Sequence, residues 1–462
     1  MALVALLAAL AGLPAEGADE RRTTGDEPHY LVTALALAAG DGLDVRRQYA
    51  DETYRPFHAA TLEPQAAPGP GGRLVEPHGP LLPALLAVPA ALGGWAAAKT
   101  VMALIAAGVA ALTLVLAVRR LGAPPGPAAA VVAVFAASMP LAPYGVQIFP
   151  EAPAALAVLA GVHGASGAVG RRGVLVTSVA VIALPWLAVK YVPVAAAIAV
   201  VALWRCARAG RRRTALTTAA VFGVAGIAFA VLHRHWYGGW TPYAAGVDAA
   251  NGESAIGSDP DLLGRAARLS GLLIDDRFGI MAWQPAWVLA VPALGVFLAR
   301  RPPGWAVVVA PLAVGWLVAT FLALTMQGWW VPGRQIVVVL PLAVAVTAWW
   351  ASAGRRPLIA TLSLGALGVV SHLVVAVEGV TGRIGWVSDL GGTGDPIHRS
   401  LTAILPDYLA PDTTTWPLHV LWSLALACLL IGAWWRARIA VRASPADRGD
   451  VVGPDAHGAR SR

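Results

Sequence analysis

The sequence is poor in charge, in cysteine and in lysine. Only 13% of its 462 residues are charged, whereas a typical soluble domain has about 25%. The two cysteines, Cys206 and Cys428, lie in or at the ends of apolar runs, so a disulfide framework is not indicated. Of the 34 basic residues only Lys99 and Lys190 are lysines. Each lysine is therefore a candidate for a specific role.

Hydrophobic residues make up 57% of the chain, and the mean hydropathy is +0.65. Apolar runs of about 20 residues recur along the sequence, and each is long enough to cross a hydrocarbon core of about 30 Å. The formal charge of +8 comes mainly from short Arg clusters between these runs. That distribution follows the positive-inside rule and argues against nucleic acid as a partner. We therefore predict an all-α, polytopic membrane protein.

The Arg clusters between spans predict the topology, because each should follow a helix that ends in the cytoplasm. About 12 transmembrane helices with both termini cytoplasmic satisfy this rule. A signal peptide is not predicted, because the N-terminus lacks a positive segment and a clear cleavage site. Residues 80–94 fit two interpretations, a surface element or a further span, and the sequence does not decide between them. The expected spans are residues 1–14 (short at its start), 95–118, 126–145, 151–169, 173–189, 192–207, 214–232, 279–298, 305–325, 335–351, 358–377 and 416–435.

The same topology divides the chain into three parts. We expect residues 1–350 to form a transmembrane module that holds the candidate catalytic residues given below. Its first extracytoplasmic loop, residues 16–79, is expected to carry amphipathic surface helices, one of them at residues 28–39. Residues 351–442 add C-terminal transmembrane helices with an extracytoplasmic loop at residues 379–415. Residues 443–462 are rich in Pro, Gly, Asp and Arg. This composition predicts a disordered cytoplasmic tail.

With this topology, most polar residues outside the Arg clusters gather on the extracytoplasmic face. The GDEPHY stretch at residues 25–30 supplies Asp26 and Glu27 as candidate catalytic acids. Neighbouring residues cannot both point at one atom from a helix, so one acid can face a substrate while the other holds the loop. The alternative is a pair of solvated loop acids, as expected for Asp19 and Glu20.

Three more charged residues belong to the candidate site. Glu151 follows Pro150 at a helix start, where a carboxylate either complements the helix dipole or serves the site. Lys190 and Arg334 lie on the outer face against the positive-inside bias. Arg334 suits a phosphate ligand, whereas Lys190 either serves the site or snorkels to lipid headgroups.

His29, Tyr191 and Gln147 are supporting candidates close in sequence to these charges. The histidines lack the HExxH spacing of a zinc site, and the cysteines lack the CxxC spacing. No cofactor or metal is therefore predicted, although a divalent ion at Asp26 and Glu151 stays open as an alternative.

Several motifs together resemble one family of membrane enzymes. They are GDEPHYL (25–31), EPHGPLLPALLAVP (76–89), VQIFPEAPAAL (146–156), LPWLAVKYVPVA (184–195), QPAWVLAVPALGVFLARR (284–301) and WWVPGRQIVVVLPLAVA (329–345). In this order the chain resembles the GT-C glycosyltransferases, which include protein O-mannosyltransferases and the lipid A aminoarabinose transferase, and it is most similar to their actinobacterial members. The resemblance covers about residues 24–350, and the C-terminal part of the chain adds nothing to it.

The resemblance implies a GT-C fold in the plasma membrane and a polyprenyl-phosphate-linked sugar as donor. It also implies an envelope glycan, lipid or protein as acceptor, with the active site on the extracytoplasmic face among membrane lipids. By the same matching, Asp26 is the catalytic carboxylate, Glu151 is the second acidic position, and Lys190 and Arg334 bind the donor phosphate. The chain departs from the family at Gly333-Arg334-Gln335, where an aromatic-Arg-Tyr pattern is more common.

Two other functions remain as alternatives. A flippase or transporter of lipid-linked sugars needs polar groups near the bilayer midplane, and only His163 and His372 lie alone inside expected spans. A non-catalytic partner in envelope assembly does not need Asp26 and Glu151, and both are present. Inverting glycosyl transfer, with Asp26 as the base, is the expected function.

Overall fold

The structure is a computed structural model that describes residues 1–17, 21–254, 256–257 and 260–443. Within these residues the secondary structure is helical and no β-strand occurs. An isolated bridge pairs Ala66 with Gly246. The predicted all-α class is therefore confirmed for the described chain.

The α-helices are α1 (Ala2–Leu10), α2 (Glu27–Ala39), α3 (Arg46–Ala50), α4 (Leu81–Arg119), α5 (Pro125–Ala136), α6 (Glu151–Ser166), α7 (Arg171–Leu187), α8 (Val192–Arg208), α9 (Arg212–Tyr237), α10 (Val247–Ala250), α11 (Leu262–Ala266), α12 (Arg268–Ile274), α13 (Ala290–Arg300), α14 (Trp305–Leu317), α15 (Leu340–Ala351), α16 (Arg355–Val380), α17 (Pro396–Thr402) and α18 (Thr415–Ala443).

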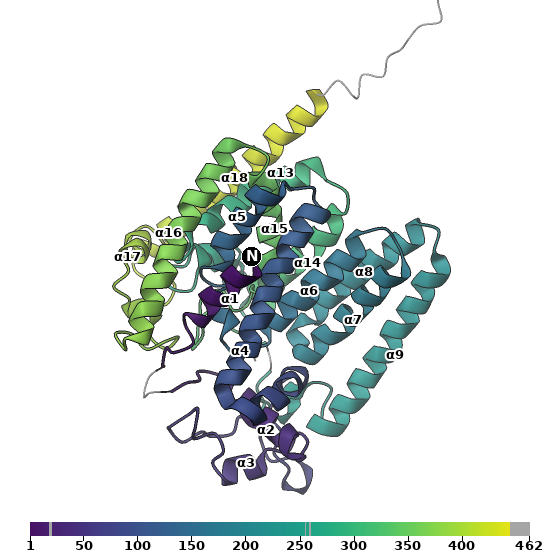
Figure 1. Cartoon of the computed structure of the whole chain (residues 1–462), viewed down its shortest axis with the longest axis vertical. Helices are drawn as coiled ribbons and strands as arrows, with labels where there is room; N and C mark the ends of the chain where they lie inside the picture. The colour runs from purple at the N-terminus through teal and green to yellow at the C-terminus, as the bar shows by residue number, and fades with distance from the viewer. Residues whose placement is uncertain (18–20, 255, 258–259, 444–462) are drawn as a thin grey trace, which may run out of the picture.

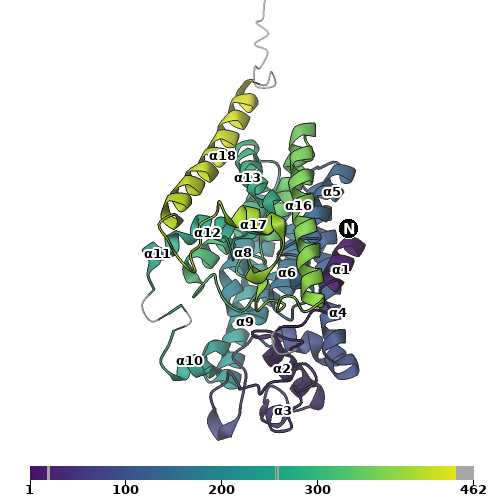
Figure 2. The ribbon, with the colours of Figure 1, turned by 90° about the vertical axis from the view of Figure 1, so that its left-hand side faces the viewer.

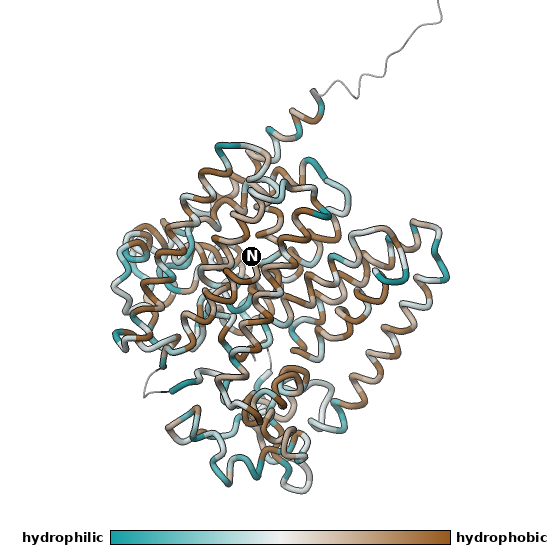
Figure 3. Tube along the Cα trace, in the orientation of Figure 1, coloured by the Kyte–Doolittle hydropathy of each residue, from teal (hydrophilic) through white to brown (hydrophobic). Residues whose placement is uncertain are grey.

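Some of these helical segments have the length and composition of membrane spans. Among the described residues, six are long and apolar enough to cross a membrane, namely Leu81–Arg119, Val189–Arg208, Arg212–Ala245, Trp305–Leu322, Arg355–Val380 and Thr415–Arg442. Three shorter apolar helices are Pro125–Ala136, Pro285–Arg300 and Leu340–Ala351. Figure 3 shows hydrophobic residues along most of the long helices. The architecture is consistent with a membrane protein, as the low charge content predicted.

The long helices run roughly side by side, as Figures 1 and 2 show, with α2 and α3 at one end of the bundle and the C-terminal end of α18 at the other. Closely packed pairs include α6 with α7, α13 with α18, and α4 with both α1 and α2. One large hydrophobic core joins residues from α1 through α18. This packing brings segments that are distant in sequence together at the α2 end of the bundle.

Residues 80–94, whose nature the sequence left open, belong to the same helical element as the expected span at residues 95–118. This element is α4, and it is interrupted at Gly93 and Gly94. Gly94 has a φ of 62°, a backbone conformation that side chains with a Cβ rarely adopt. The segment is therefore the first part of α4, joined to the rest of the helix by a glycine kink.

The helix expected at residues 28–39 is α2, but it does not lie on a surface. Pro28 occupies its first turn, where proline is favoured, and the helix ends at Gly40, whose φ is 85°. Nine of its 13 residues are buried, and it packs against α4. An amphipathic surface helix buries only one face. The expectation of a surface helix is therefore wrong for α2, because the neighbouring helix and loops cover it.

The loop expected at residues 379–415 is fastened back onto α16 by buried polar contacts. Glu378 accepts hydrogen bonds from Thr393 Oγ1 (2.5 Å) and from Gly394 N (3.0 Å). Ser371 Oγ donates to Asp395 Oδ2 (2.5 Å). Except for Ala443, which ends α18, the expected disordered tail lies outside the described residues. The Asp19 and Glu20 pair also lies outside them.

The contact between α13 and α18 makes a testable prediction at Gly295. An added Cβ there would lie 2.4 Å from the Leu430 carbonyl oxygen of α18. The substitution Gly295→Ala should therefore force the two helices apart and lower the free energy of unfolding by about 1–3 kcal/mol. The measurement is the thermal unfolding midpoint of the purified protein in detergent. Gly432→Ala is the matched control, because nothing lies within 4 Å of a Cβ at that position. Equal midpoints for both variants would contradict the packing.

Candidate functional site

Asp26 occupies the N-cap position of α2, at the end of a tight turn. Gly25 before it has a φ of 55°, and an added Cβ would lie 3.0 Å from the Trp329 carbonyl oxygen. The Asp26 side chain makes no capping hydrogen bond to its own helix, and it is 25% exposed. The turn therefore presents the carboxylate to the segment around residue 330 instead of using it to cap α2.

Asp26 is the first member of a row of four alternating charges. Arg334 donates from its guanidinium to Asp26 Oδ2 (2.5 Å) and from Nε to Glu151 Oε1 (3.2 Å). Lys190 Nζ donates to the same Glu151 oxygen at 2.7 Å. The four residues come from the N-cap of α2, the first turn of α6, the short helix Val189–Tyr191 and the loop before α15. The structure thus brings together four of the charged residues that the sequence singled out.

Burial differs along this row. The Glu151 side chain is fully buried and that of Arg334 is 9% exposed, whereas those of Asp26 and Lys190 are 25% and 33% exposed. The two ends of the row are thus open to a ligand, while its middle is closed. Glu151 Oε2 is buried without a hydrogen-bond partner. The formal charges of the four residues sum to zero.

The pKa of Asp26 reflects this environment. Burial alone would raise it, because burial disfavours the charged form. The Arg334 guanidinium opposes that effect, with smaller contributions from His78 and Gln65, and the net result is a pKa well below the ordinary value. Asp26 is therefore ionised at neutral pH while Arg334 remains paired with it.

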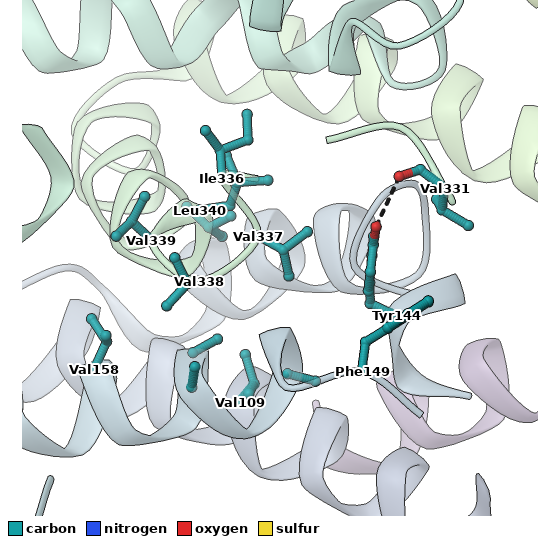
Figure 4. Packing of buried hydrophobic residues seen from close by; sticks show 14 of the residues in the cluster. Val109, Tyr144, Phe149, Val158, Val331, Ile336, Val337, Val338, Val339 and Leu340 are labelled. Carbon is teal, nitrogen blue, oxygen red and sulfur yellow. Dashed lines mark hydrogen bonds between the residues drawn. The ribbon is translucent and has the colours of Figure 1, made fainter. Parts of the chain in front are cut away.

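Aromatic rings and a buried hydrogen bond hold Arg334 in place. Its guanidinium carbon lies 4.2 Å from the centre of the Phe149 ring and 4.8 Å from the centre of the Trp330 ring. The Tyr144 hydroxyl donates to the Val331 carbonyl oxygen at 2.9 Å, and Figure 4 shows this contact beside Phe149. Ring stacking and two carboxylate partners make the position specific for arginine.

Glu27 points away from this row. It is 1% exposed, and its Oε1 accepts from the Ile148 backbone N (2.8 Å) and lies 3.4 Å from Lys99 Nζ. Its Oε2 accepts from the Thr24 backbone N at 2.9 Å. Glu27 thus joins the turn that carries Asp26 to α4 and to the loop before α6. In this arrangement Asp26 faces the open site, and Glu27 holds the turn.

His29 lies in a second polar cluster, behind the turn. Its Nδ1 is 2.8 Å from the Tyr49 hydroxyl and 3.2 Å from Glu76 Oε1, and the Tyr49 hydroxyl donates to Glu76 Oε1 at 2.5 Å. His29 is buried. It therefore ties α2 to the rest of the first loop and does not join the row of four charges.

The other two supporting candidates are buried polar residues without side-chain partners. The Tyr191 hydroxyl and both amide atoms of Gln147 are buried and form no hydrogen bond. The Tyr191 ring centre lies 5.4 Å from Lys190 Nζ. Buried polar groups normally have partners, so these atoms leave hydrogen-bonding capacity unused in the buried structure around the site.

Several residues to which the sequence analysis did not assign roles lie around the start of α2. Gln65 Nε2 donates to Asp26 Oδ1 at 3.4 Å. The His78 ring stacks on Tyr30, with ring centres 4.6 Å apart and an interplanar angle of 26°. Lys99 pairs with Glu27, and the scarcity of lysine was the signal that pointed to it. For Gln65 and His78 no spacing rule was available, because both lie in irregular loops.

Arg334 also separates the two acids considered for a divalent ion, since it bridges Asp26 and Glu151. Among the described residues, no group of three His, Cys, Asp or Glu side chains is placed to hold a metal ion.

Comparisons with protein-family models, with curated proteins and with solved structures found no match for this chain. The site offers one partly exposed cation, Lys190, and one nearly buried cation, Arg334, together with the partly exposed carboxylate of Asp26.

The buried Glu27–Lys99 pair generates a stability prediction. Replacing Glu27 with Gln leaves the Lys99 ammonium buried without a counter-charge, which typically costs about 3–5 kcal/mol. The double variant with Lys99→Met should recover part of that loss, and unfolding midpoints of the purified single and double variants measure the coupling. The control is Asp44→Asn, which breaks a more exposed pair with Arg46 and should cost less than about 1 kcal/mol. Additive effects of the two buried substitutions would contradict the pairing.

Proposed function

We propose that this protein is an integral membrane glycosyltransferase of GT-C type with about 12 spans. It moves a sugar from a polyprenyl-phosphate carrier to an extracytoplasmic acceptor, which is an envelope glycan, lipid or protein. Its site lies on the extracytoplasmic face of the plasma membrane. One observation carries the proposal: Arg334 and Lys190 meet at one buried carboxylate, within 3.2 Å, and Arg334 also pairs with the partly exposed Asp26.

The directions of the helices support an extracytoplasmic site. Helices α4, α6 and α8 begin close to the site residues His78, Glu151 and Lys190. Each is followed or ended by an Arg cluster, at residues 119–120, 171–172 and 205–213 respectively. Because Arg clusters stay in the cytoplasm, the opposite ends of these helices, where the charged row lies, belong on the other face.

A large apolar cavity supports a lipid-linked donor. It lies among α12, α13, α14, α15 and α18 and has a volume of about 630 Å³. Apolar side chains such as Trp287, Leu294 and Leu312 form most of its wall. Ile280 also lines it and lies against Gly333, the residue before Arg334. A prenyl chain in this cavity would have its phosphate end near Arg334.

In the proposed reaction the donor phosphate competes with Asp26 for Arg334. A phosphodiester carries one negative charge, and a guanidinium binds phosphate through charge-assisted hydrogen bonds. When Arg334 turns to the phosphate, the pKa of Asp26 rises, because its main counter-charge has moved away. Asp26 then becomes a stronger base for the acceptor hydroxyl, which attacks the anomeric carbon. Lys190 and Arg334 stabilise the second negative charge that develops on the leaving phosphate.

The assay uses purified protein, a panel of polyprenyl-phospho-sugars and an envelope extract as the source of acceptor. Loss of sugar from the carrier is scored for wild type and for Asp26→Asn. Since a general base typically contributes 10²–10⁴ in rate, Asp26→Asn should reduce transfer by at least about 100-fold while the protein remains folded. Asp261→Asn makes the same chemical change at the exposed cap of α11 and should transfer like wild type.

A transporter gives a different result in the same system. In sealed vesicles it would move labelled carrier between leaflets without forming a glycoside, and Asp26→Asn would leave the sugar on its carrier as wild type does. Near-normal transfer by Asp26→Asn would sink the assignment of the base. Intact carrier with every donor, together with movement between leaflets, would replace the proposed enzyme with a transporter.

A further inference from the structure

His78 is held rigidly beside the site by its backbone. Its carbonyl oxygen accepts a hydrogen bond from the Tyr237 hydroxyl of α9 at 2.9 Å. The next residue, Gly79, fits against the end of α7, where an added Cβ would lie 2.3 Å from the Leu187 carbonyl oxygen. The imidazole lies over the ring of Tyr30, four residues after Asp26. Three elements therefore fix the position of this ring.

One nitrogen of the His78 ring has no partner. Nε2 is buried and forms no hydrogen bond, whereas buried polar atoms normally have one. A neutral imidazole carries a lone pair on the nitrogen that lacks the proton, so Nε2 can hold that lone pair in a place sheltered from water. A protonated imidazole would instead present an N–H donor there. Nε2 can therefore accept a proton, and it has no hydrogen-bond partner while the site is empty.

The charges around the ring oppose one another. Burial lowers the pKa of His78, and the nearby Arg334 guanidinium lowers it further, while the carboxylates of Asp26 and Glu76 raise it. The net pKa lies below the ordinary value, which is about 6.5. His78 is therefore neutral at pH 7 in the empty site. A bound ligand that carries negative charge raises the pKa of His78, because negative charge favours the imidazolium. If the ligand also draws Arg334 away, the pKa rises further, because a nearby positive charge is lost.

We propose that His78 is the proton store of this site, neutral when the site is empty and protonated at Nε2 when a phosphomonoester dianion occupies Lys190 and Arg334. The inference rests on the proposed function, since that function makes the carrier phosphomonoester its product. It assigns to His78 a role that is separate from the base: Asp26 removes the proton, and His78 keeps it.

The chemistry of the transfer balances with this assignment. The acceptor O–H bond breaks, a C–O bond forms at the anomeric carbon, and the bond from that carbon to the phosphate oxygen breaks with its electron pair going to the phosphate. The phosphate charge changes from −1 to about −2 in this step. The released proton passes from Asp26 to His78. The imidazolium then offsets the added negative charge while Asp26 is again ionised and ready for the next acceptor.

The test measures binding of farnesyl phosphate, a short prenyl phosphomonoester, to the purified protein by titration calorimetry. Between about pH 7 and pH 8.5 the ligand is mostly dianionic, since the second pKa of a phosphomonoester is about 6. If one proton binds with the ligand, the association constant should fall by up to about tenfold per pH unit. Titration in two buffers of different protonation enthalpy should give an uptake approaching one proton per ligand in the lower part of this range.

Variants identify the group that takes the proton. His78→Gln should still bind farnesyl phosphate, but its association constant should change by less than about twofold over the same pH range, because the titrating group is gone. His58→Gln is the matched control, because the His58 ring also has a buried nitrogen without a hydrogen-bond partner, and it lies outside the row of four charges. This control should show the same pH dependence as wild type.

Three outcomes decide against the inference. Proton uptake near zero in wild type overturns it without any variant, which covers the case in which His78→Gln fails to fold. Undiminished uptake in a folded His78→Gln variant means that another group or the ligand itself takes the proton. Failure of the wild-type protein to bind farnesyl phosphate at any pH removes the phosphate site and thus the proposed function as well, whereas binding without proton uptake removes only the role of His78.

Discussion

The guanidinium of Arg334 is the group on which the candidate site depends. It is almost fully buried, and arginine does not lose its charge in proteins, so its position requires negative partners. Asp26 and Glu151 supply them from segments that are far apart in the sequence. Glu151 is itself fully buried and needs Lys190 as a second cation. Removing any one of the four leaves a charge uncompensated, and for this reason the first loop, α6, the Val189–Tyr191 turn and the loop before α15 have to come together.

The length of the apolar runs predicted several helices well, because a long segment without charge is stable only where it is buried or faces lipid. Helices α8, α9, α16 and α18 lie close to where the hydropathy of the sequence placed them. The span expected at residues 279–298 is not one continuous α-helix: two short 3₁₀ turns, the second beginning at Pro285, precede α13. The burial of α2 could not be predicted from the sequence either, since it depends on which neighbouring segments cover this short helix.

In the candidate site, too, some features were predictable from the sequence and others were not. Asp26, Glu151, Lys190 and Arg334 stood out in the sequence because isolated charges in an apolar chain require an explanation, and the structure places them in one row. Which acid pairs with which cation did not follow from spacing, because the two contacts of Arg334 join residues more than a hundred positions apart. The family resemblance had singled out Asp26 over Glu27, and the structure adds the physical reason for the separate place of Glu27, which is Lys99 beside it. Their roles in binding and catalysis remain proposals that rest on chemistry and on the family resemblance.

The cancellation of charge within the row has a consequence for how ligands reach the site. Two positive and two negative groups within a few ångströms of one another create a field that decays quickly with distance, and salt screens the remainder within about 10 Å. Long-range electrostatic steering, which accelerates the encounter of many charged ligands with their proteins, is therefore weak here. A charged lipid would instead arrive by lateral diffusion in its leaflet, and its rate of encounter would depend on membrane fluidity and hardly at all on ionic strength.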